Sequence, residues 1–530
     1  MESSSDERQE EPSATWEMEI FNQSESQSES QSDVTRTRRP SSEHHRRHEF
    51  LGVRLESYTD AVFAIVGTIL IAYLNQIVLP RLQDPSNSLQ HHCFENANFF
   101  SVYHFTFLHI SVIWLNHSRV FSMIERVNDV LIWMNMALLY FMSFMPLTFG
   151  LLGEFNDTYE GLVFPSITII LINTLMAVIV WYVYRKKRFL PSNMSDVHAK
   201  YFEKAMYFKL LIFPVVAALA ILVGYFSLLP GRLLFYSSVF VVFIPKVVAN
   251  CIWWWRKTEI TAEVVQVLRV TVSKDRIEFF ADGVYSIIAT LVILEITIIG
   301  IPSRVEVNQN FNGSLLRALD NNRVDYITYF TTFLIISLLW FVHHSLFNFI
   351  KQLNSLMFLV HQCSLSFVGV VPSLVELFAV FFRPGTSEAD KATAIQVAAT
   401  GVGIVGLLQF LLLALMNFAD DECVDQTLFH SESSLHLLLK VTIIPVNCVI
   451  AYWSSMGSES VRQYAFIVLY ITGPLAFVVI NIVIKSTTLH ALCKHCWKKK
   501  SACFKPFQQD KPAQSENPYP KVIHNMSFLY

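Results

Sequence analysis

Residues 54–71 read RLESYTDAVFAIVGTILI, and residues 276–293 read RIEFFADGVYSIIATLVI. Each stretch opens on an arginine, carries an aspartate six positions later, and then continues as an apolar run. The two stretches align without a gap at an offset of 222 residues. Because chance does not keep such a register, we predict that the chain holds two copies of one structural unit.

The composition of the chain is typical of a membrane protein. Of its 530 residues, 53% are hydrophobic and only 16% are charged, with a mean hydropathy of +0.40, whereas a soluble domain is about 25% charged. The apolar residues fall into blocks of about 20, the length that an α-helix needs to cross a bilayer. The net charge of -3 leaves no basic surface for nucleic acid, so we expect no nucleic-acid partner.

We predict an all-α polytopic membrane protein with twelve transmembrane helices, six in each repeat. The spans of the first repeat are residues 55–76, 97–116, 130–152, 162–184, 208–228 and 232–254. Those of the second repeat are residues 277–300, 325–350, 355–382, 393–417, 436–453 and 463–485. Since each repeat holds an even number of spans, both enter the membrane from the same side and are parallel.

Further residues keep the two repeats in register beyond the first span. Each of them recurs at an offset of 226, so the only change in length falls in the loop after the first span. The recurring residues are Trp114, His117, Asn128 and Pro146 in the first repeat, and Trp340, His343, Asn354 and Pro372 in the second.

We expect the chain to divide into five parts. These are a disordered cytosolic N-terminus (1–50), the first repeat (51–254), a cytosolic linker (255–275), the second repeat (276–485) and a cytosolic C-terminal tail (486–530). Lysine and arginine are concentrated in the tail, the linker and the loop after the fourth span, which places both termini in the cytosol. Two glycosylation sequons, at Asn156 and Asn312, fall in loops on the opposite, luminal side.

Asp60 and Asp282 lie inside the first span of each repeat, where a charged residue is costly and usually faces protein or water. Two interpretations are open for them. Either each carboxylate pairs with Arg54 or Arg276, or with the Trp–His pair of the second span, and fixes helix packing, or it contacts permeating ions.

A stripe of side chains also runs along each first span. At about 100° per residue, one face holds Ala61, Ile65, Thr68 and Ala72 in the first repeat, and Gly283, Ile287, Thr290 and Leu294 in the second. Such a face either lines a narrow pore, with isoleucine as a hydrophobic constriction and threonine as a polar step, or packs against a neighbouring helix.

The doubled signature that opens each first span, together with the Trp-x-x-His pair that follows, resembles the transmembrane protein 175 family of endosomal and lysosomal potassium channels. The resemblance covers about residues 50–485. It implies a homodimer in which the first helix of each repeat lines one shared pore. It also places Ile65 and Ile287 at the narrowest point, with Thr68 and Thr290 nearby.

The resemblance further implies a hydrogen-bonded network that holds the pore helices. Its members in this sequence are Arg54, Asp60, Trp114 and His117 of the first repeat, and Arg276, Asp282, Trp340 and His343 of the second. Where the family has Phe-Ser-Asp, this chain has Thr59 and Ala281 at the serine position. The second repeat therefore lacks the hydroxyl of that network.

The expected function is a potassium channel, with protons as a further permeant ion implied by the resemblance. No Walker, zincin or nucleophile-elbow motif is present, so we expect no enzyme activity, cofactor or metal. No Thr-Val-Gly-Tyr-Gly filter occurs either, so selectivity would come from the isoleucine constriction.

Two other classes of protein stay open on the sequence alone. A secondary transporter is also built of two parallel six-span halves, and Glu295 and Glu376 would be its midspan carboxylates. A membrane scaffold would signal through the two tails.

For localisation, residues 519–522 (YPKV) have the form of a Tyr-x-x-bulky sorting signal, which together with the resemblance favours endosomes and lysosomes. Membrane lipid is expected around the spans, and the partners of the tails are unknown.

Overall fold

The computed structural model describes residues 41–82, 87–186, 188–191, 195–248, 251, 274–299, 301–381, 385–429, 431–462 and 471–483. Residues 1–51 and residues 52–530 form two separate units, and the contacts discussed below belong to the second. Residues 1–40 of the predicted disordered N-terminus, residues 255–273 of the predicted linker and the predicted tail lie outside the described residues. Helix α2 begins at Ser41, so residues 41–50 are described as part of this helix.

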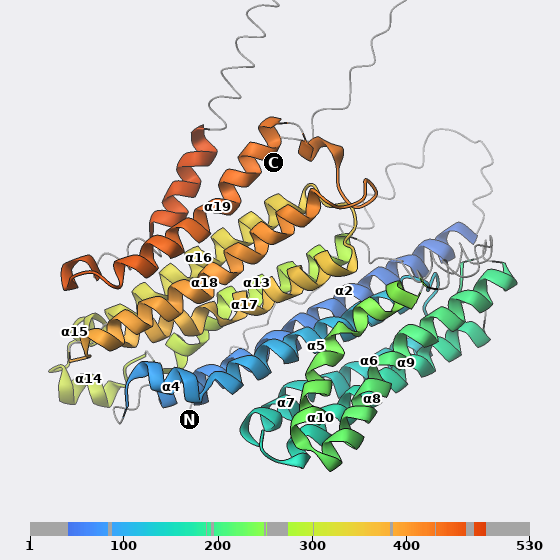
Figure 1. Ribbon diagram of the computed structural model, residues 1–530, viewed down its shortest axis with the longest axis horizontal. Coiled ribbons are helices and arrows are strands. Elements are labelled where there is room, and N and C mark those ends of the chain that lie inside the picture. Colours follow the sequence, from blue (N-terminus) through green and yellow to red (C-terminus); the bar gives the residue numbers. More distant parts are fainter. Residues whose placement is uncertain are drawn as a thin grey trace, which may run out of the picture. The chain divides into compact units, whose positions relative to one another are not determined.

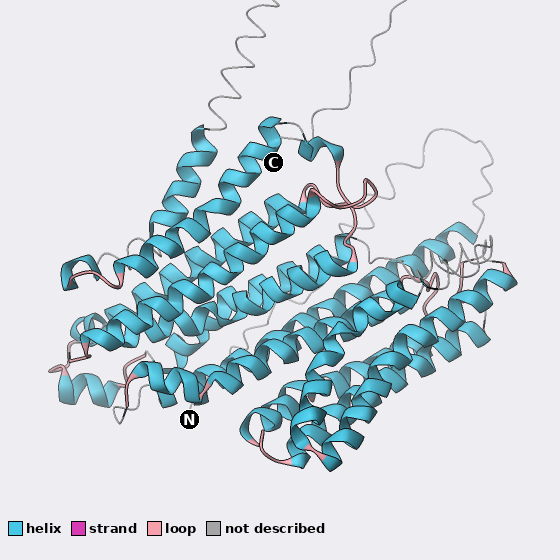
Figure 2. Cartoon of the chain, in the orientation of Figure 1, coloured by secondary structure: helices cyan, strands magenta, loops and turns pink. Residues whose placement is uncertain are grey.

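In the described residues of the first repeat, the regular secondary structure is helical (Figures 1 and 2). Its elements are α2 (Ser41–Tyr73), η1 (Leu74–Val78), α3 (Leu79–Leu82), α4 (Leu89–Glu95), α5 (Ala97–Phe121), α6 (Asp129–Met142), α7 (Met145–Glu154), α8 (Tyr159–Arg185), α9 (Asp196–Phe226), α10 (Leu228–Ser237) and η2 (Ser238–Phe243). The segment η1 is a single π-helical turn that continues α2.

The second repeat is also helical, and its helices follow the same order along the chain. Its elements are α13 (Lys274–Ile299), α14 (Arg304–Asn310), α15 (Leu315–Asn321), α16 (Arg323–Phe347), α17 (Ser355–Phe381), α18 (Glu388–Met416), η3 (Gln426–Phe429) and α19 (Ser431–Ser454). Among the described residues, the only β pairing is an isolated bridge between Ile350 and Val424.

Ten helical segments within the described residues are long and apolar enough to cross a membrane. They match ten of the twelve predicted spans, while α13 and the short apolar helix Gly473–Val483 occupy the places of the other two. The prediction of an all-α polytopic membrane protein with two parallel repeats is therefore confirmed.

The third span differs between the repeats, which the sequence alignment did not foresee. In the first repeat it is broken into α6 and α7, and Pro146 lies in the first turn of α7, where a missing backbone donor is tolerated. In the second repeat α17 runs without a break through Pro372. The start of the span is the same in both: the Asn128 side chain accepts from the amide of Leu131, and the Asn354 side chain accepts from the amide of Met357.

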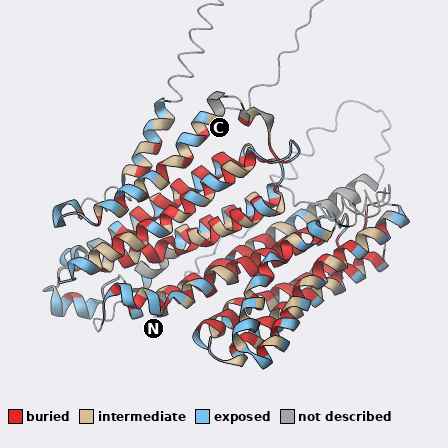
Figure 3. Cartoon of the chain, in the orientation of Figure 1, coloured by how far each residue is buried: buried red, intermediate tan, exposed pale blue. Residues whose placement is uncertain are grey.

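Helices α5 and α17 form the centre of the structure. In the most apolar stretch of each span, 83% of α17 and 67% of α5 is buried inside the protein (Figure 3). These are the highest values among the ten spans found in the described residues. The two helices pack against each other and so join the repeats. Gly369 of α17 makes this close approach possible, because a Cβ atom there would lie 1.8 Å from the Tyr103 hydroxyl of α5.

Replacing Gly369 with alanine should therefore destabilise the protein by about 2 kcal/mol, since Tyr103 is fully buried and has no space to withdraw. The measurement is thermal unfolding of the purified full-length protein. Tyr103→Phe, which removes the clashing hydroxyl, should restore part of the loss in the double variant. Gly150→Ala is the matched control, because no atom lies within 4 Å of a Cβ at Gly150. Equal stability of the two alanine variants would contradict this account of the α5–α17 contact.

Candidate functional site

A buried ion pair joins the first helices of the two repeats. The Asp60 carboxylate of α2 accepts hydrogen bonds from Arg276 of α13, at 2.6 Å from Nη2 and 3.1 Å from Nε. It also accepts one from the Trp114 indole of α5, at 2.7 Å from Nε1. Of the two interpretations of Asp60, the structure has the one in which the carboxylate pairs, and its partner is Arg276 of the other repeat.

The surroundings of this pair exclude solvent. Asp60 is 2% exposed and Arg276 is 9% exposed. The Trp114 ring stacks on Phe280 of α13 at 4.7 Å between ring centroids. Arg276 has a further contact, from Nη1 to the backbone carbonyl of Ser118 at 3.3 Å. A carboxylate and a guanidinium in this bidentate geometry neutralise each other, so the group is a clamp between helices rather than a free charge. We call Asp60, Trp114 and Arg276 the clamp.

The second repeat keeps only part of the clamp. Trp340 of α16 donates to Asp282 of α13 at 2.7 Å, which repeats the Trp114–Asp60 bond. Asp282, however, lies at the surface of the chain, and Trp340 is 37% exposed. Within the described part of the chain, Trp340 is the one hydrogen-bond partner of the Asp282 carboxylate, and no cation pairs with it. Arg54, which is equivalent to Arg276, also lies at the surface.

The two histidines predicted for the network do not contact the aspartates. His117 Nε2 lies 2.8 Å from the Asn135 side-chain oxygen, and Asn135 in turn donates to the Thr59 hydroxyl at 2.8 Å. Because the amide oxygen only accepts, His117 carries its proton on Nε2. Thr59 thus fills the place of the signature serine and fixes α2 to α6.

The corresponding site of the second repeat is rebuilt with other residues. Ala281 replaces Thr59, and His361, at the offset of 226, replaces Asn135. The His343 ring stacks on His361 at 5.0 Å and lies 5.4 Å from the Tyr285 ring. The loss of one hydroxyl is therefore matched by the loss of the amide that it bonded. Sequence reasoning missed Asn135 and His361, although their common offset could have drawn attention to them.

The exposed face of the first helices differs in part from the predicted stripe. Ile65 is 48% exposed and shares its face with Ile69. Thr68 lies elsewhere: its side chain is fully buried and its hydroxyl donates to the carbonyls of Ala64 and Ile65. The sequence analysis placed Thr68 on the same face as Ile65 because it used only the helical angle of about 100° per residue. It did not consider which neighbouring helices cover each side of α2.

In the second repeat the order of exposure is reversed. Ile287 is half-buried, and Thr290 lies at the surface, where its hydroxyl donates to the carbonyls of Ser286 and Ile287. The two first helices also approach each other closely, because a Cβ atom at Gly283 would lie 3.1 Å from the Cβ of Ala64. Ala64, the residue before Ile65, thus lies next to Gly283 of α13.

The two predicted sequons lie in different environments. Asn156, between α7 and α8, is half-buried, and its side-chain oxygen accepts from Arg232 at 2.9 Å. The sequon threonine, Thr158, is engaged as the cap of α8. Asn312, between α14 and α15, is exposed and has a positive φ of 52°. Of the two, Asn312 is the one whose amide stands open to solvent.

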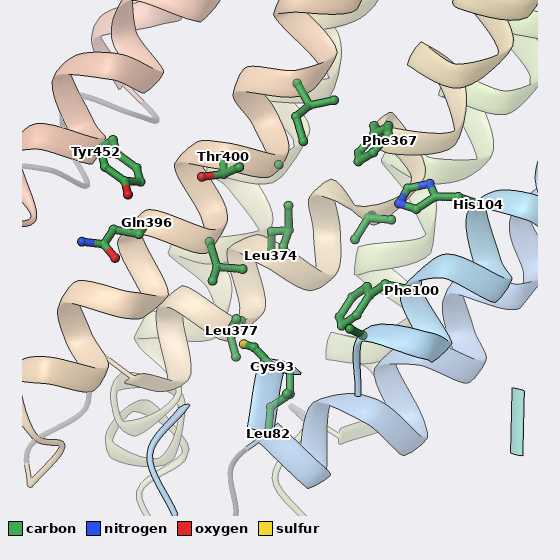
Figure 4. A pocket seen from close by; sticks show the side chains of 15 residues that line it. Leu82, Cys93, Phe100, His104, Phe367, Leu374, Leu377, Gln396, Thr400 and Tyr452 are labelled. Atoms are coloured by element: carbon green, nitrogen blue, oxygen red, sulfur yellow. The ribbon is translucent and has the colours of Figure 1, made fainter. Parts of the chain in front are cut away.

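A cavity of about 400 Å³ lies between α5 of the first repeat and α17 and α18 of the second (Figure 4). Its wall is mostly apolar, with Phe100, Phe367 and Leu374 among its residues. His104 stacks on Phe367 at 4.0 Å and contacts the Ser366 hydroxyl at 3.1 Å. Burial raises the pKa of the Cys93 thiol to about 11, so that group stays neutral. The cavity therefore offers no charge that would attract a cation.

The fold and the clamp define a helical membrane protein made of two repeats, each with an Asp–Trp pair near the start of its first span. The profile of the family described as "Endosomal/lysosomal potassium channel TMEM175" matches residues 54–146 and 276–372, the stretches that carry these pairs. The chain thus contains two stretches, one in each repeat, that match the TMEM175 family model.

Curated relatives are similar to the chain over most of its length. The chain is 28% identical over 446 residues to the endosomal/lysosomal proton channel TMEM175 of Gallus gallus, covering 82% of this chain and 87% of the relative. It is 27% identical over 442 residues to the Homo sapiens protein of the same name, covering 81% and 86%. The crystal structure of a lysosomal potassium-selective channel TMEM175 homologue from Chamaesiphon minutus matches with a TM-score of 0.32 and 21% identity, covering 39% of this chain and 96% of that one.

Asp60→Asn should destabilise the protein by about 3–5 kcal/mol, because it leaves the buried Arg276 guanidinium without its carboxylate. Glu56→Gln is the matched control. Glu56 also faces Arg276, but at 3.7 Å and with a more exposed side chain, so its loss should cost about 1 kcal/mol or less. Thermal unfolding of the purified full-length variants measures both effects. Similar losses for the two variants would show that Asp60 is not the carboxylate that holds Arg276.

Proposed function

We propose that this protein is a cation channel of endosomal and lysosomal membranes that passes potassium and also protons. The observation that carries the proposal is the Asp–Trp pair repeated on the first helix of each half, in a chain with two stretches that match a family described as a potassium channel and whose curated relatives are named proton channels. A pore lined by the first helices requires that these helices keep fixed positions, and the clamp holds α2 and α13 together in this way. The same comparisons favour a channel over the secondary transporter, and they describe a channel family rather than an enzyme family.

The constriction of the pore is assigned to Ile65 and Ile287, with Thr68 and Thr290 next to it. An apolar side chain at a narrow point makes an ion shed part of its water, and the larger, less strongly hydrated cation loses less in doing so. The exposure of Ile65 supports this role for the first repeat. The burial of Thr68 argues that its hydroxyl supports the helix, whereas Thr290 has a hydroxyl at the surface.

Two first helices cannot enclose a pore, so the proposal requires a homodimer in which four of them surround one axis. The incomplete clamp of the second repeat supports this assembly. In the first repeat, the Asp60 carboxylate of α2 pairs with Arg276, which lies near the start of α13, the first helix of the second repeat. By the equivalence of the repeats, Asp282 meets Arg54 of a second copy. The exposed Asp282 and Trp340 then become buried between copies.

The arrangement in the membrane follows from the charges and the sequons. Both termini lie in the cytosol, and Asn312 is the better acceptor for luminal glycosylation. Exposed apolar residues on the outer helices, such as Val215 of α9 and Val449 of α19, are covered by membrane lipid. Residues 51–254 and 276–485 act as the two pore-forming repeats, joined by the linker 255–275.

Patch-clamp recording on enlarged endolysosomes that express the protein tests the proposal. With potassium and then sodium as the only cation, we expect a current without any counter-substrate and a marked preference for potassium.

Replacing Ile65 and Ile287 together with asparagine should raise sodium permeability several-fold, because the constriction no longer demands dehydration. The Ile65→Leu/Ile287→Leu variant keeps an apolar constriction and should keep the preference. A double asparagine variant with unchanged ion preference would remove both residues from the constriction, and absence of any current would favour a transporter.

The dimer contact can be tested by exchanging charges. Asp282→Arg and Arg54→Asp should each shift the detergent-solubilised protein from dimer to monomer, measured by light scattering after size-exclusion chromatography. The variant with both changes should recover the dimer, because opposite charges again meet between copies. Glu278→Gln is the control, since Glu278 pairs within its own helix with Lys274 at 3.6 Å. Dimers that persist in both single variants would place the contact elsewhere.

A further inference from the structure

A second cavity, of about 280 Å³, lies at the end of the helices where the two repeats begin. It is enclosed by the last turn of α5, the start of α13, the start of α17 and the loop that follows α18. By the charge distribution of the loops this is the cytosolic end. The residues that line it are Leu115, Arg119, Val242, Pro245, Lys246, Ile277, Gln352, Leu353, Asn354, Ser355, Phe358, Asp420, Glu422 and Cys423.

Arg119 is the residue that gives this cavity its character. Its side chain lines the cavity and is only 9% exposed, yet no carboxylate within the described residues lies at ion-pair distance from it. Its Nε atom is buried without a hydrogen-bond partner there. Burying a guanidinium in this way is costly unless something supplies the missing charge.

Arg119 has a second buried basic side chain near it. This is Lys209 of α9, which is only 4% exposed. The packing of the repeats does not demand the arginine, because the equivalent position in the second repeat is Ser345. The positive charge of Arg119 is therefore particular to this cavity and is not a feature that the two repeats share.

The remaining polar groups divide by depth. Arg119 and the N-terminus of the 27-residue helix α17 give the inner part of the cavity a positive potential. Lys246, Asp420 and Glu422 all stand exposed at the rim, so the outer part carries one positive and two negative side chains. An anionic group would reach Arg119, while the rim favours donors or a cationic group further out on the same molecule.

We propose that this cavity binds a phosphate group. A guanidinium offers two parallel N–H donors that match two phosphate oxygens, and this pairing is stronger in a site shielded from water. The phosphate could belong to the headgroup of a membrane lipid, since the cavity lies at the end of the spans, or to a soluble phosphate compound of the cytosol.

Occupancy of this cavity would reach the clamp through short connections. Ile277, which lines the cavity, follows Arg276 of the clamp. Arg276 itself binds the carbonyl of Ser118, the residue before Arg119. A phosphate bound to Arg119 would therefore act on the end of α5, to which Arg276 is bonded through the Ser118 carbonyl. The site is placed to adjust the position of α13.

Thermal unfolding of the purified full-length protein in detergent tests the proposal, and this readout does not require ion conduction. The probes are inorganic phosphate and a water-soluble, dioctanoyl phosphatidylinositol phosphate, each titrated at constant ionic strength. We expect a dose-dependent rise in Tm for the unchanged protein. Arg119→Gln should weaken the response at least about tenfold. The exposed Arg126, seven residues further along the chain, provides the matched control, and Arg126→Gln should respond like the unchanged protein.

The outcomes separate the two sources of phosphate and the role of Arg119. A response to inorganic phosphate assigns a soluble ligand, and a response to the phosphoinositide alone assigns a lipid headgroup. Without any probe, Arg119→Gln should be at least as stable as the unchanged protein, because it removes an uncompensated buried charge. If that variant does not fold, Lys246→Gln at the exposed rim replaces it and should weaken the response several-fold. No response to either probe, or an equal response in the cavity variant and in Arg126→Gln, overturns the proposal.

Discussion

The structure depends on one ion pair that crosses between the repeats. Asp60 belongs to the first helix of the first repeat and Arg276 to the first helix of the second, and both side chains are buried. Burying either charge without the other is costly, so the pair favours the arrangement in which the two helices lie next to each other. The Trp114 indole closes the site from a third helix. The distance between the two helices is thereby fixed by chemistry and not only by the fit of apolar side chains.

The duplicated chain uses this chemistry unequally. The first repeat has a complete clamp inside the chain and a polar connection from Thr59 through Asn135 to His117. The second repeat leaves Asp282 at the surface and replaces the polar connection with stacked rings. Gene duplication allows such divergence, because one copy can satisfy the fold while the other adapts to what lies outside it. The asymmetry is therefore informative about assembly.

Much of the fold could be predicted from the sequence, because spans of about 20 apolar residues and a register kept over two halves are strong signals. The signature aspartates and tryptophans could be paired for the same reason. The choice of Arg276 rather than Arg54 as the partner of Asp60 could not, since both arginines occupy equivalent positions and only packing separates them. Nor could the burial of Thr68 or the break at Pro146, which depend on neighbouring helices. Arg119 gave no signal at all, as a lone arginine near the end of a span is ordinary.

The π-helical turn at Leu74–Val78 has a consequence for the symmetry of the molecule. Such a turn inserts one residue into a helix and rotates everything beyond it by about 100°. It also directs Asn75 to the Ser373 hydroxyl of α17. Helix α13 has no such turn along Lys274–Ile299. The two first helices, alike at their beginnings, thus differ in rotational phase beyond this turn. In the proposed homodimer, the four first helices would therefore present equivalent surfaces to the pore before the turn, whereas beyond the turn only the helices of the same repeat would present equivalent surfaces.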